Sequence, residues 1–236
     1  MLTGPQNSSA LVRTGLENTR RRIAAAAFDA HRDPATVTLL AVSKQQPAEA
    51  VRAAFALGQR DFGENYVQEA IAKIDALADL EIVWHFIGQL QSNKTRAVAE
   101  RFHWVHTVDR ERIARRLSEQ RPHHAPPLKV CLQVKLDPEP GKGGVAVDDL
   151  PALAARVAEL PRLELRGLMC IPEPRETAVE QRAIFDRLAA ALAALQAAGH
   201  RMDTLSMGMS ADLETAVAAG ATIVRIGTAI FGERPR

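Results

Sequence analysis

The sequence predicts a closed barrel of eight parallel strands, each followed by a helix, with one extra helix at the N-terminus. Short apolar runs alternate with helical patterns along the chain, and no stretch is typical of a domain linker. This alternation favours a parallel sheet, and eight units favour a (β/α)8 barrel over an open doubly wound sheet. The 236 residues fit a single domain, 1–236, with a flexible start over residues 1–8.

Composition narrows the class of protein. Hydrophobic residues make up 47% of the chain, enough for a sizeable core, whereas aromatic residues make up only 4%, too few for nucleic-acid stacking platforms. The net charge is +2, and the one basic run, Arg20 to Arg22, is typical of a solvated helix face, with nucleic-acid binding as the alternative. The two cysteines, Cys131 and Cys170, have no paired spacing. No membrane span or signal peptide is expected, so we expect a cytoplasmic protein.

The first strand is the most informative one. Residues 36–44 form a β-branched and aliphatic run that ends in Lys44, and Pro47 then favours a helix start. Lys44 would therefore lie at the carboxyl end of a buried strand, where parallel α/β folds bind ligands. A desolvated lysine there can act as an amine nucleophile toward aldehydes. The alternative is a lysine that extends into water.

The other elements follow from the same patterns. Strands are predicted at residues 61–65, 82–87, 104–108, 128–134, 163–169, 204–206 and 222–226. Helices are predicted at about residues 9–31, 47–57, 66–80, 93–101, 109–120, 148–160, 177–198 and 210–219. Asp109 and Ser210 are expected to cap helices at their N-termini, and Gly58 and Gly199 to end helices. The N-terminal helix would cover the barrel where the last strand has no long helix after it.

A phosphate site is predicted after strands seven and eight, where such barrels commonly bind phosphate. Residues 206–210, Ser-Met-Gly-Met-Ser, follow strand seven, and Gly227-Thr228 follow strand eight. Glycines allow close approach of the backbone, and hydroxyls can donate to phosphate oxygens. Ser210 as a simple N-cap and Gly227 as a simple turn are the alternatives. Because Lys44 would share this rim, a phosphorylated aldehyde is the ligand that uses both features.

Six stretches carry a resemblance to a known family. They are LLAVSK (39–44), FGENYVQE (62–69), WHFIG with LQSNK (84–94), RGLM (166–169), LSMGMS (205–210) and VRIGTAIFG (224–232). In this order they closely resemble the pyridoxal phosphate homeostasis protein family, often called YggS or PROSC proteins. The likeness runs from about Ser9 to the end of the chain. It implies a type III pyridoxal-phosphate fold, similar to the barrel domain of alanine racemase.

The resemblance also implies a cofactor, pyridoxal 5'-phosphate (PLP), held as a Schiff base on Lys44. By the same match, Arg225 would face the pyridine side of the cofactor, where a permanent positive charge disfavours protonation of the ring nitrogen and weakens the ring as an electron sink. A buried ion pair is the alternative for Arg225. The complete set of implied site residues is Lys44, Asn65, His85, Met169, Ser206, Met207, Ser210, Arg225, Gly227 and Thr228.

Within that set the resemblance assigns roles. Ser206, Gly227 and Thr228 would contact the phosphate, with Met207 and Ser210 nearby. Two other residues, Asn65 and His85, would line the cofactor pocket, and Met169 would pack against the ring.

Other polar residues attract weaker hypotheses. His103 and His106 would point to opposite faces of a strand, so a metal pair is not expected. Glu64 is either a general acid or base or a structural group at a strand end. The loop with Lys142 and Gly144 lacks the spacing of a phosphate loop and resembles the family's Lys-x-Gly loop, whose role the sequence does not reveal.

Three functions remain in competition on sequence alone. The resemblance implies a non-catalytic protein that holds PLP and serves cofactor and amino-acid homeostasis, with PLP-dependent apo-enzymes as further partners. The alternative is a weak type III PLP enzyme such as an amino-acid racemase; the third is a barrel that binds another phosphate. The chain stops at Arg236 and its only tyrosine is Tyr66, so we expect no second catalytic base, negligible racemase activity and a monomer.

Overall fold

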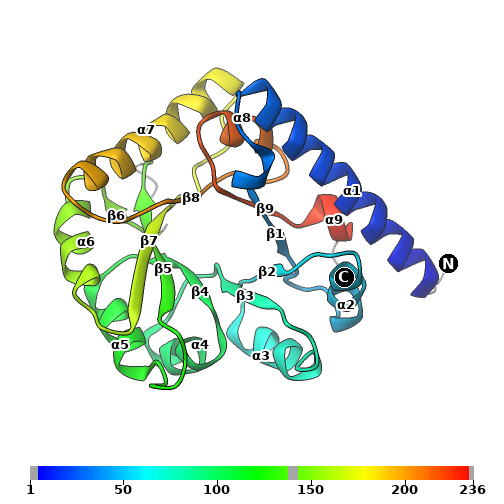
Figure 1. The fold of residues 1–236 in the computed structure, drawn as a ribbon, viewed down its shortest axis with the longest axis horizontal. Helices are drawn as coiled ribbons and strands as arrows, with labels where there is room; N and C mark the ends of the chain where they lie inside the picture. The colour runs from blue at the N-terminus through cyan, green and yellow to red at the C-terminus, as the bar shows by residue number, and fades with distance from the viewer. Residues whose placement is uncertain (1–4, 138–142, 234–236) are drawn as a thin grey trace.

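The computed structural model describes residues 5–137 and 143–233, and these form the predicted barrel (Figure 1). The strands are β1 (Thr38–Val42), β2 (Asp61–Glu64), β3 (Val83–Phe86), β4 (Trp104–Val108), β5 (Leu128–Lys135), β6 (Val145–Ala146), β7 (Leu163–Met169), β8 (Thr204–Ser206) and β9 (Ile223–Ile226). All are paired in parallel, and pairing of β1 with β9 and of β4 with β5 closes the ring. The fold prediction is therefore confirmed.

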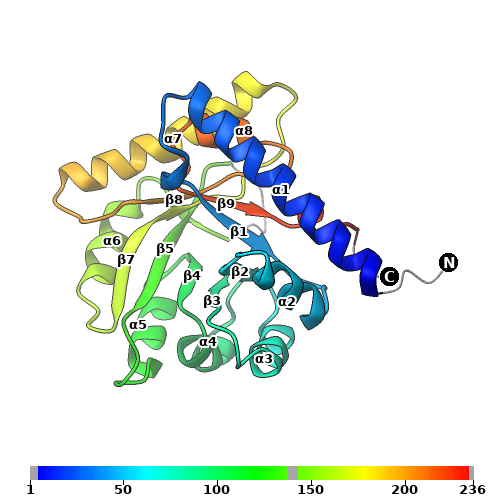
Figure 2. The same cartoon turned by 45° about the vertical axis from the view of Figure 1, so that its right-hand side comes forward.

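Helices surround the strands on the outside of the ring (Figures 1 and 2). They are α1 (Pro5–Asp29), α2 (Ala48–Ala56), α3 (Val67–Ala76), α4 (Thr95–Arg101), α5 (Glu111–Gln120), α6 (Leu150–Ala158), α7 (Ala178–Ala197), α8 (Leu213–Ala218) and α9 (Thr228–Phe231), with 3-10 turns η1 (Pro34–Thr36) and η2 (Ser92–Lys94). Thr177 starts α7 with a capping box to Glu180, which explains the start expected there. No helix of the described residues has the length and apolarity that crossing a membrane requires.

Local details differ from the sequence prediction. Helix α1 begins at Pro5, four residues before the expected start, and residues 1–4 lie outside the described part. The short strand β6 was not predicted; it extends the sheet beside the end of β5. Asp109 and Ser210 do not act as N-caps, because α5 and α8 begin later and have Arg110 and Asp212 in the cap positions.

Side-chain alternation separates two apolar regions. On β1, Leu39 and Ala41 face outward and join the large core between strands and helices. Leu40 and Val42 instead join Ile87 and Ile223 in a small cluster inside the ring. A second interior cluster consists of Trp104, Cys131 and Met169. Successive side chains of a strand point to opposite faces, so each barrel strand supplies both regions.

The N-terminal helix covers the seam where the last strand meets the first. Helix α1 packs against α2, α8 and α9, the position predicted for it (Figure 2). Arg20 and Arg22, in the basic run, hold it in place: Arg20 donates to the carbonyl oxygen of Leu57 (3.0 Å), and Arg22 pairs with Glu214 (2.7 Å). Two of the three arginines in the basic run therefore make contacts within the protein that fix α1.

Gly15 sets the distance between α1 and α9. A Cβ atom at this position would lie 2.6 Å from the carbonyl oxygens of Ala229 and Ile230, closer than any side chain can approach backbone. Because α9 begins at Thr228, on the predicted phosphate site, the α1–α9 contact also supports that site.

We expect Gly15→Ala to destabilise the protein. Alanine favours a helix by about 1 kcal/mol over glycine, but overpacking against backbone costs about 1–3 kcal/mol, and the clash at Gly15 is severe enough for the second effect to prevail. Urea denaturation measures the difference. Thr14→Ala, at the exposed neighbouring position, is the control and should be neutral or slightly stabilising. Equal stability of Gly15→Ala and the parent would show that α1 can shift without cost.

Candidate functional site

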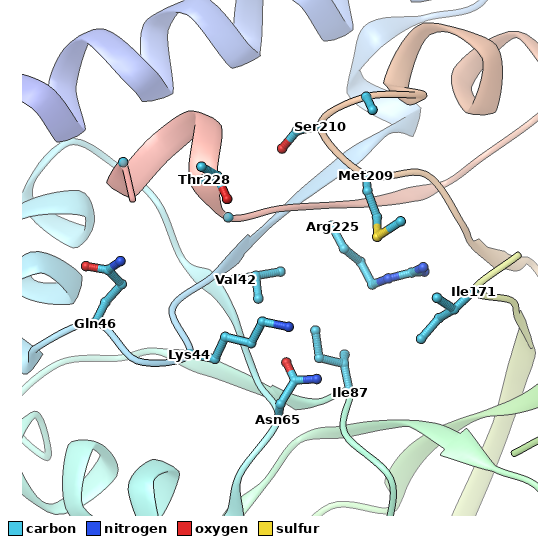
Figure 3. A pocket seen from close by; sticks show the side chains of 13 residues that line it. Val42, Lys44, Gln46, Asn65, Ile87, Ile171, Met209, Ser210, Arg225 and Thr228 are labelled. Carbon is cyan, nitrogen blue, oxygen red and sulfur yellow. The ribbon is translucent and has the colours of Figure 1, made fainter. Parts of the chain in front are cut away.

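A cavity of about 370 Å³ opens at the carboxyl ends of the barrel strands (Figure 3). This is the size range of small-molecule and cofactor sites. Its lining residues are Val42, Lys44, Gln46, Asn65, Ile87, Ile171, Met209, Ser210, Ala211, Arg225, Gly227, Thr228 and Gly232. They come from segments between residues 42 and 232 that closure of the ring brings together.

Two kinds of polar group face each other across the cavity. Figure 3 shows Ser210 and Thr228 on one side, and Lys44 with Asn65 on the other. The guanidinium of Arg225 extends between them toward Ile171. A ligand that spans the cavity would thus meet hydroxyls at one end, an amine at the other and a cation along its edge.

The hydroxyl side depends on two glycines. Gly208 has φ +94°, and a Cβ atom there would lie 2.5 Å from the Cβ of Ala216, so this turn after β8 accepts only glycine without rearrangement. Gly227 lies where a Cβ atom would come within 3.2 Å of the carbonyl oxygen of Val42. At the start of α9 the N–H groups of Ile230 and Phe231 donate to the carbonyl oxygen of Gly227, which leaves the N–H groups of Thr228 and Ala229, with the Ser210 and Thr228 hydroxyls, to donate to an anion.

The amine side is a tight turn after β1. Gln45 has φ +60°, an uncommon conformation for a residue other than glycine. Helix α3 holds this turn through two side chains. The Lys73 ammonium donates to the carbonyl oxygen of Ser43 (2.5 Å), and the backbone N–H of Gln45 donates to the Glu69 carboxylate (2.5 Å). The backbone on both sides of Lys44 is therefore fixed from outside the barrel.

Behind this turn lies a buried ion cluster. Lys73 contacts both Glu64 (2.7 Å) and Glu69 (2.6 Å), and the hydroxyl of Ser43 donates to Glu64 (2.6 Å). Burial raises the pKa of Glu64, although the Lys73 charge opposes the shift. Glu64 is fully buried and is not among the residues that line the cavity, so of the two roles open to it, the structural one fits its position.

Arg225 is the only arginine among the residues that line the cavity, and it is 5% exposed. It donates to the hydroxyl of Ser206 (2.9 Å) and to the carbonyl oxygen of Cys170 (2.8 Å). These bonds go to neutral oxygens, which disfavours the direct ion pair considered as an alternative. Burial lowers the pKa of Arg225, yet an arginine keeps its charge in proteins.

Below the cavity a chain of polar side chains crosses the barrel interior. Asp61 Oδ1 lies 3.0 Å from His85 Nε2, and His85 Nδ1 lies 2.9 Å from His106 Nε2. His106 Nδ1 lies 2.8 Å from Ser206 Oγ, which accepts from Arg225. Burial lowers the pKa of both histidines, well below the usual value for His106, so both are neutral at pH 7.

The cavity contains six of the ten residues expected at the site, namely Lys44, Asn65, Ser210, Arg225, Gly227 and Thr228. The other four expected residues are not among those that line the cavity, and their roles toward a cofactor stay predictions. His85 and Ser206 belong to the buried polar chain, Met169 is fully buried with Trp104 and Cys131, and Met207 is fully buried in the outer core. His85, Met169 and Ser206 point into the barrel one layer below the cavity lining, since its interior is filled in layers.

Sequence reasoning missed several lining residues that a period of two would have found. Ile87 lies two positions after His85, and Ile171 two positions after Met169, on the same faces and one layer nearer the rim. Val42 precedes Lys44 by the same step. The amide side chain of Gln46 and the thioether of Met209 come from loops, where no period applies.

The donor chemistry of the cavity suits an organic phosphate more than a metal ion. Asn65 Oδ1 is a buried acceptor without a hydrogen-bond partner in the described structure, available to a ligand donor. Residues 5–137 and 143–233 contain no cluster of three or more metal-ligating side chains, and His103 faces the Trp84 amide (3.0 Å), away from His106. Lys142, of the Lys-x-Gly loop, lies outside the described residues.

Comparison with known proteins identifies relatives over nearly the whole chain. The family profile described as alanine racemase, N-terminal domain, matches residues 16–235. A pyridoxal phosphate homeostasis protein from Pseudomonas aeruginosa is 62% identical over 213 residues, 90% of this chain and 91% of that protein. One from Escherichia coli K12 is 53% identical over 222 residues, covering 93% and 95%.

Solved structures agree with these matches. PipY from Synechococcus elongatus, in a structure with PLP bound, superposes with a TM-score of 0.80 at 44% identity, covering 90% of this chain and 99% of that one. Alanine racemase from Corynebacterium glutamicum superposes with a TM-score of 0.74 at 16% identity, covering 95% and 62%, a likeness of fold.

The buried ion cluster makes a stability prediction. Lys73→Met leaves Glu64 buried without its cation, and removing one partner of a buried pair costs about 3–5 kcal/mol. Without Lys73 the pKa of Glu64 is raised further above its unfolded value, so the folded state binds the extra proton and the deficit shrinks as pH falls from 8 toward 5. Denaturation at several pH values measures this.

The matched control is Glu64→Gln/Lys73→Met, which removes both charges. We expect it to be more stable than Lys73→Met at pH 8 and to lose the added pH dependence. A double variant as unstable as the single one at every pH would contradict the electrostatic explanation and indicate lost packing of the Lys73 stem.

Proposed function

Because the chain belongs to the pyridoxal phosphate homeostasis protein family, whose barrel is that of the alanine racemase N-terminal domain, we propose that its rim cavity holds PLP on Lys44. The observation that carries the proposal is the placement of an amine and a hydroxyl-lined anion site on opposite sides of one cavity. PLP has an aldehyde and a phosphate-bearing CH2–O arm on adjacent carbons of its ring, so an amine and an anion site that open into one cavity can hold both groups. The PLP-bound PipY structure supports the same ligand.

The phosphate would be held by backbone and hydroxyl donors. Ser210 and Thr228 supply hydroxyl groups, and the backbone at Gly227 can approach closely because it has no side chain. Charge-assisted hydrogen bonds of this type are stronger than neutral ones. In this arrangement Ser210 takes the place first expected for Ser206, whose hydroxyl lies in the buried chain.

Lys44 would hold the aldehyde end. A bound PLP would be held through a C=N bond between the Lys44 nitrogen and the aldehyde carbon, with the carbonyl oxygen released as water. The turn held by Glu69 and Lys73 keeps the amine at the cavity. Asn65 Oδ1 is an acceptor within the same wall.

Arg225 would lie beside the pyridine ring and limit what the ligand can do. PLP supplies enzymes with an electron sink, which works best when the ring nitrogen is protonated. A guanidinium donates to that nitrogen and disfavours the added proton. The contact between Arg225 and the ring nitrogen would therefore favour a protein that holds PLP over an enzyme that stabilises a substrate carbanion.

We infer that the protein binds PLP without turning over amino acids and serves cofactor and amino-acid homeostasis. Two-base racemisation needs an acid–base group on each side of the ring, and Tyr66, the only tyrosine, is 53% exposed and does not line the cavity. PLP-dependent apo-enzymes are the proposed recipients. A monomer in the cytoplasm fits this role, as do the two buried free thiols, Cys131 and Cys170.

The first prediction concerns Lys44. The purified protein with added PLP should show a near-visible absorption band that borohydride fixes to the peptide containing Lys44. Lys44→Ala should lose the band and the label, because no other amine lines the cavity within the described residues. Lys94→Ala, a change outside the cavity, is the control and should keep both.

Two outcomes would change the conclusion. A label on another lysine would overturn the assignment to Lys44. Robust conversion of L-alanine to D-alanine by the same purified protein would overturn the non-catalytic role and favour the weak racemase.

A second prediction separates the two ends of the ligand. Thr228→Val removes a hydroxyl but keeps the shape, so we expect about tenfold weaker binding of PLP, the loss of one hydrogen bond to a charged group. Binding of pyridoxal, which has no phosphate, should not change. Absorbance titration with both ligands measures this, and an equal loss for both would place the phosphate elsewhere.

A further inference from the structure

The buried chain from Asp61 to Arg225 joins the two ends of the barrel. Asp61 begins β2, at the end opposite the cavity, and its side chain is 28% exposed in a shallow hollow it shares with Arg20 and Arg60. Arg225, at the other end of this hydrogen-bonded chain, lines the cavity. Between them each polar atom has a partner within 3.0 Å.

The direction of this chain follows from its ends. An ionised carboxylate only accepts hydrogen bonds, so Asp61 requires a proton on His85 Nε2. His85 is neutral, so its Nδ1 accepts from His106 Nε2. The remaining His106 nitrogen, Nδ1, must then accept from the hydroxyl of Ser206.

The direction matters for Arg225. When the Ser206 hydroxyl donates to His106, its oxygen keeps a lone pair for the guanidinium. In the reversed direction His106 would also donate to that oxygen, and the hydroxyl proton would need another acceptor beside the Arg225 donors. The reversed chain is therefore the poorer support for Arg225.

Ring packing and charge restrict the alternatives. The His85 ring stacks on Trp104, with centroids 5.4 Å apart and an interplanar angle of 7°, so its plane is fixed. Burial disfavours a charged imidazolium at both rings; the Asp61 carboxylate opposes this at His85, whereas the Arg225 charge adds to it at His106. The hydrogen-bonded chain can therefore reverse its direction only if both histidines change tautomer. The groups at its two ends, Asp61 and Arg225, then decide which direction is favoured.

We propose that the Asp61 carboxylate, across the barrel from the cavity, is a positioning residue that sets the tautomers of His85 and His106 and thereby holds Arg225. This extends the proposed function, since Arg225 is the group proposed to lie beside the PLP ring. The positioning itself is a property of the protein without cofactor.

The test is ¹⁵N NMR of the histidine rings in the cofactor-free protein. The unchanged protein should show both His85 and His106 as Nε2–H tautomers. Asp61→Asn presents either an acceptor or a donor to His85, so we expect mixed tautomers and at least threefold faster hydrogen exchange of the Arg225 guanidinium. Glu81→Ala, which removes an exposed charge at the same end of the barrel, is the control and should change neither.

Several results would overturn the proposal. An Nδ1–H tautomer at either histidine of the unchanged protein contradicts the derived direction. Pure Nε2–H tautomers in Asp61→Asn show that the carboxylate charge is not what sets it. If Asp61→Asn does not fold, Asp61→Ala serves in its place with the same expectation.

A cofactor titration then separates this proposal from the proposed function. We expect Asp61→Asn to bind PLP about two- to tenfold more weakly, the range for one hydrogen bond. If the unchanged protein binds no PLP, the proposed function fails while the NMR result stands. Altered tautomers with unchanged PLP affinity would show that Arg225 does not depend on the chain.

Discussion

Closure of the parallel ring is the constraint on which the rest of the molecule depends. Strand β1 pairs with β2 on one side and with β9 on the other, so the first and last strands lie side by side. Because all strands of the ring run in the same direction, their carboxyl ends form one rim. That rim is why Lys44 and Thr228, from opposite ends of the chain, line the same cavity. No local feature of either segment could place them together.

The interior of the ring contains both apolar and polar side chains. Two small apolar clusters share it with a hydrogen-bonded chain that ends in a buried guanidinium. Burying a charge away from a carboxylate costs several kcal/mol unless oriented dipoles replace the lost water. The Cys170 carbonyl and the Ser206 hydroxyl do so here.

The sequence was sufficient for the architecture, because strand and helix patterns are local and their alternation restricts the topology. It was also sufficient for residues at the last position of a strand or just beyond it, such as Lys44 and Asn65. The depth at which a side chain lies within the barrel was less predictable. His85 and Ser206 have the correct facing but belong to the layer beneath the cavity, since a period of two gives the face and not the level. The hydrogen bond by which Lys73 of α3 fixes the turn at Lys44 could not be predicted, because the position of Lys73 in the helical pattern is typical of a surface residue.

The contact between α1 and α9 also bears on how the protein is made. During synthesis the lysine side of the cavity leaves the ribosome early, and the hydroxyl side only after Thr228 has been added. The packing of helix α1 is delayed in the same way, because two of the helices against which it packs are α8 and α9. Such distant pairings are slow to form because loop closure precedes any gain from contact. A ligand that contacts both sides of the cavity therefore cannot bind until β9 has paired with β1 and closed the ring.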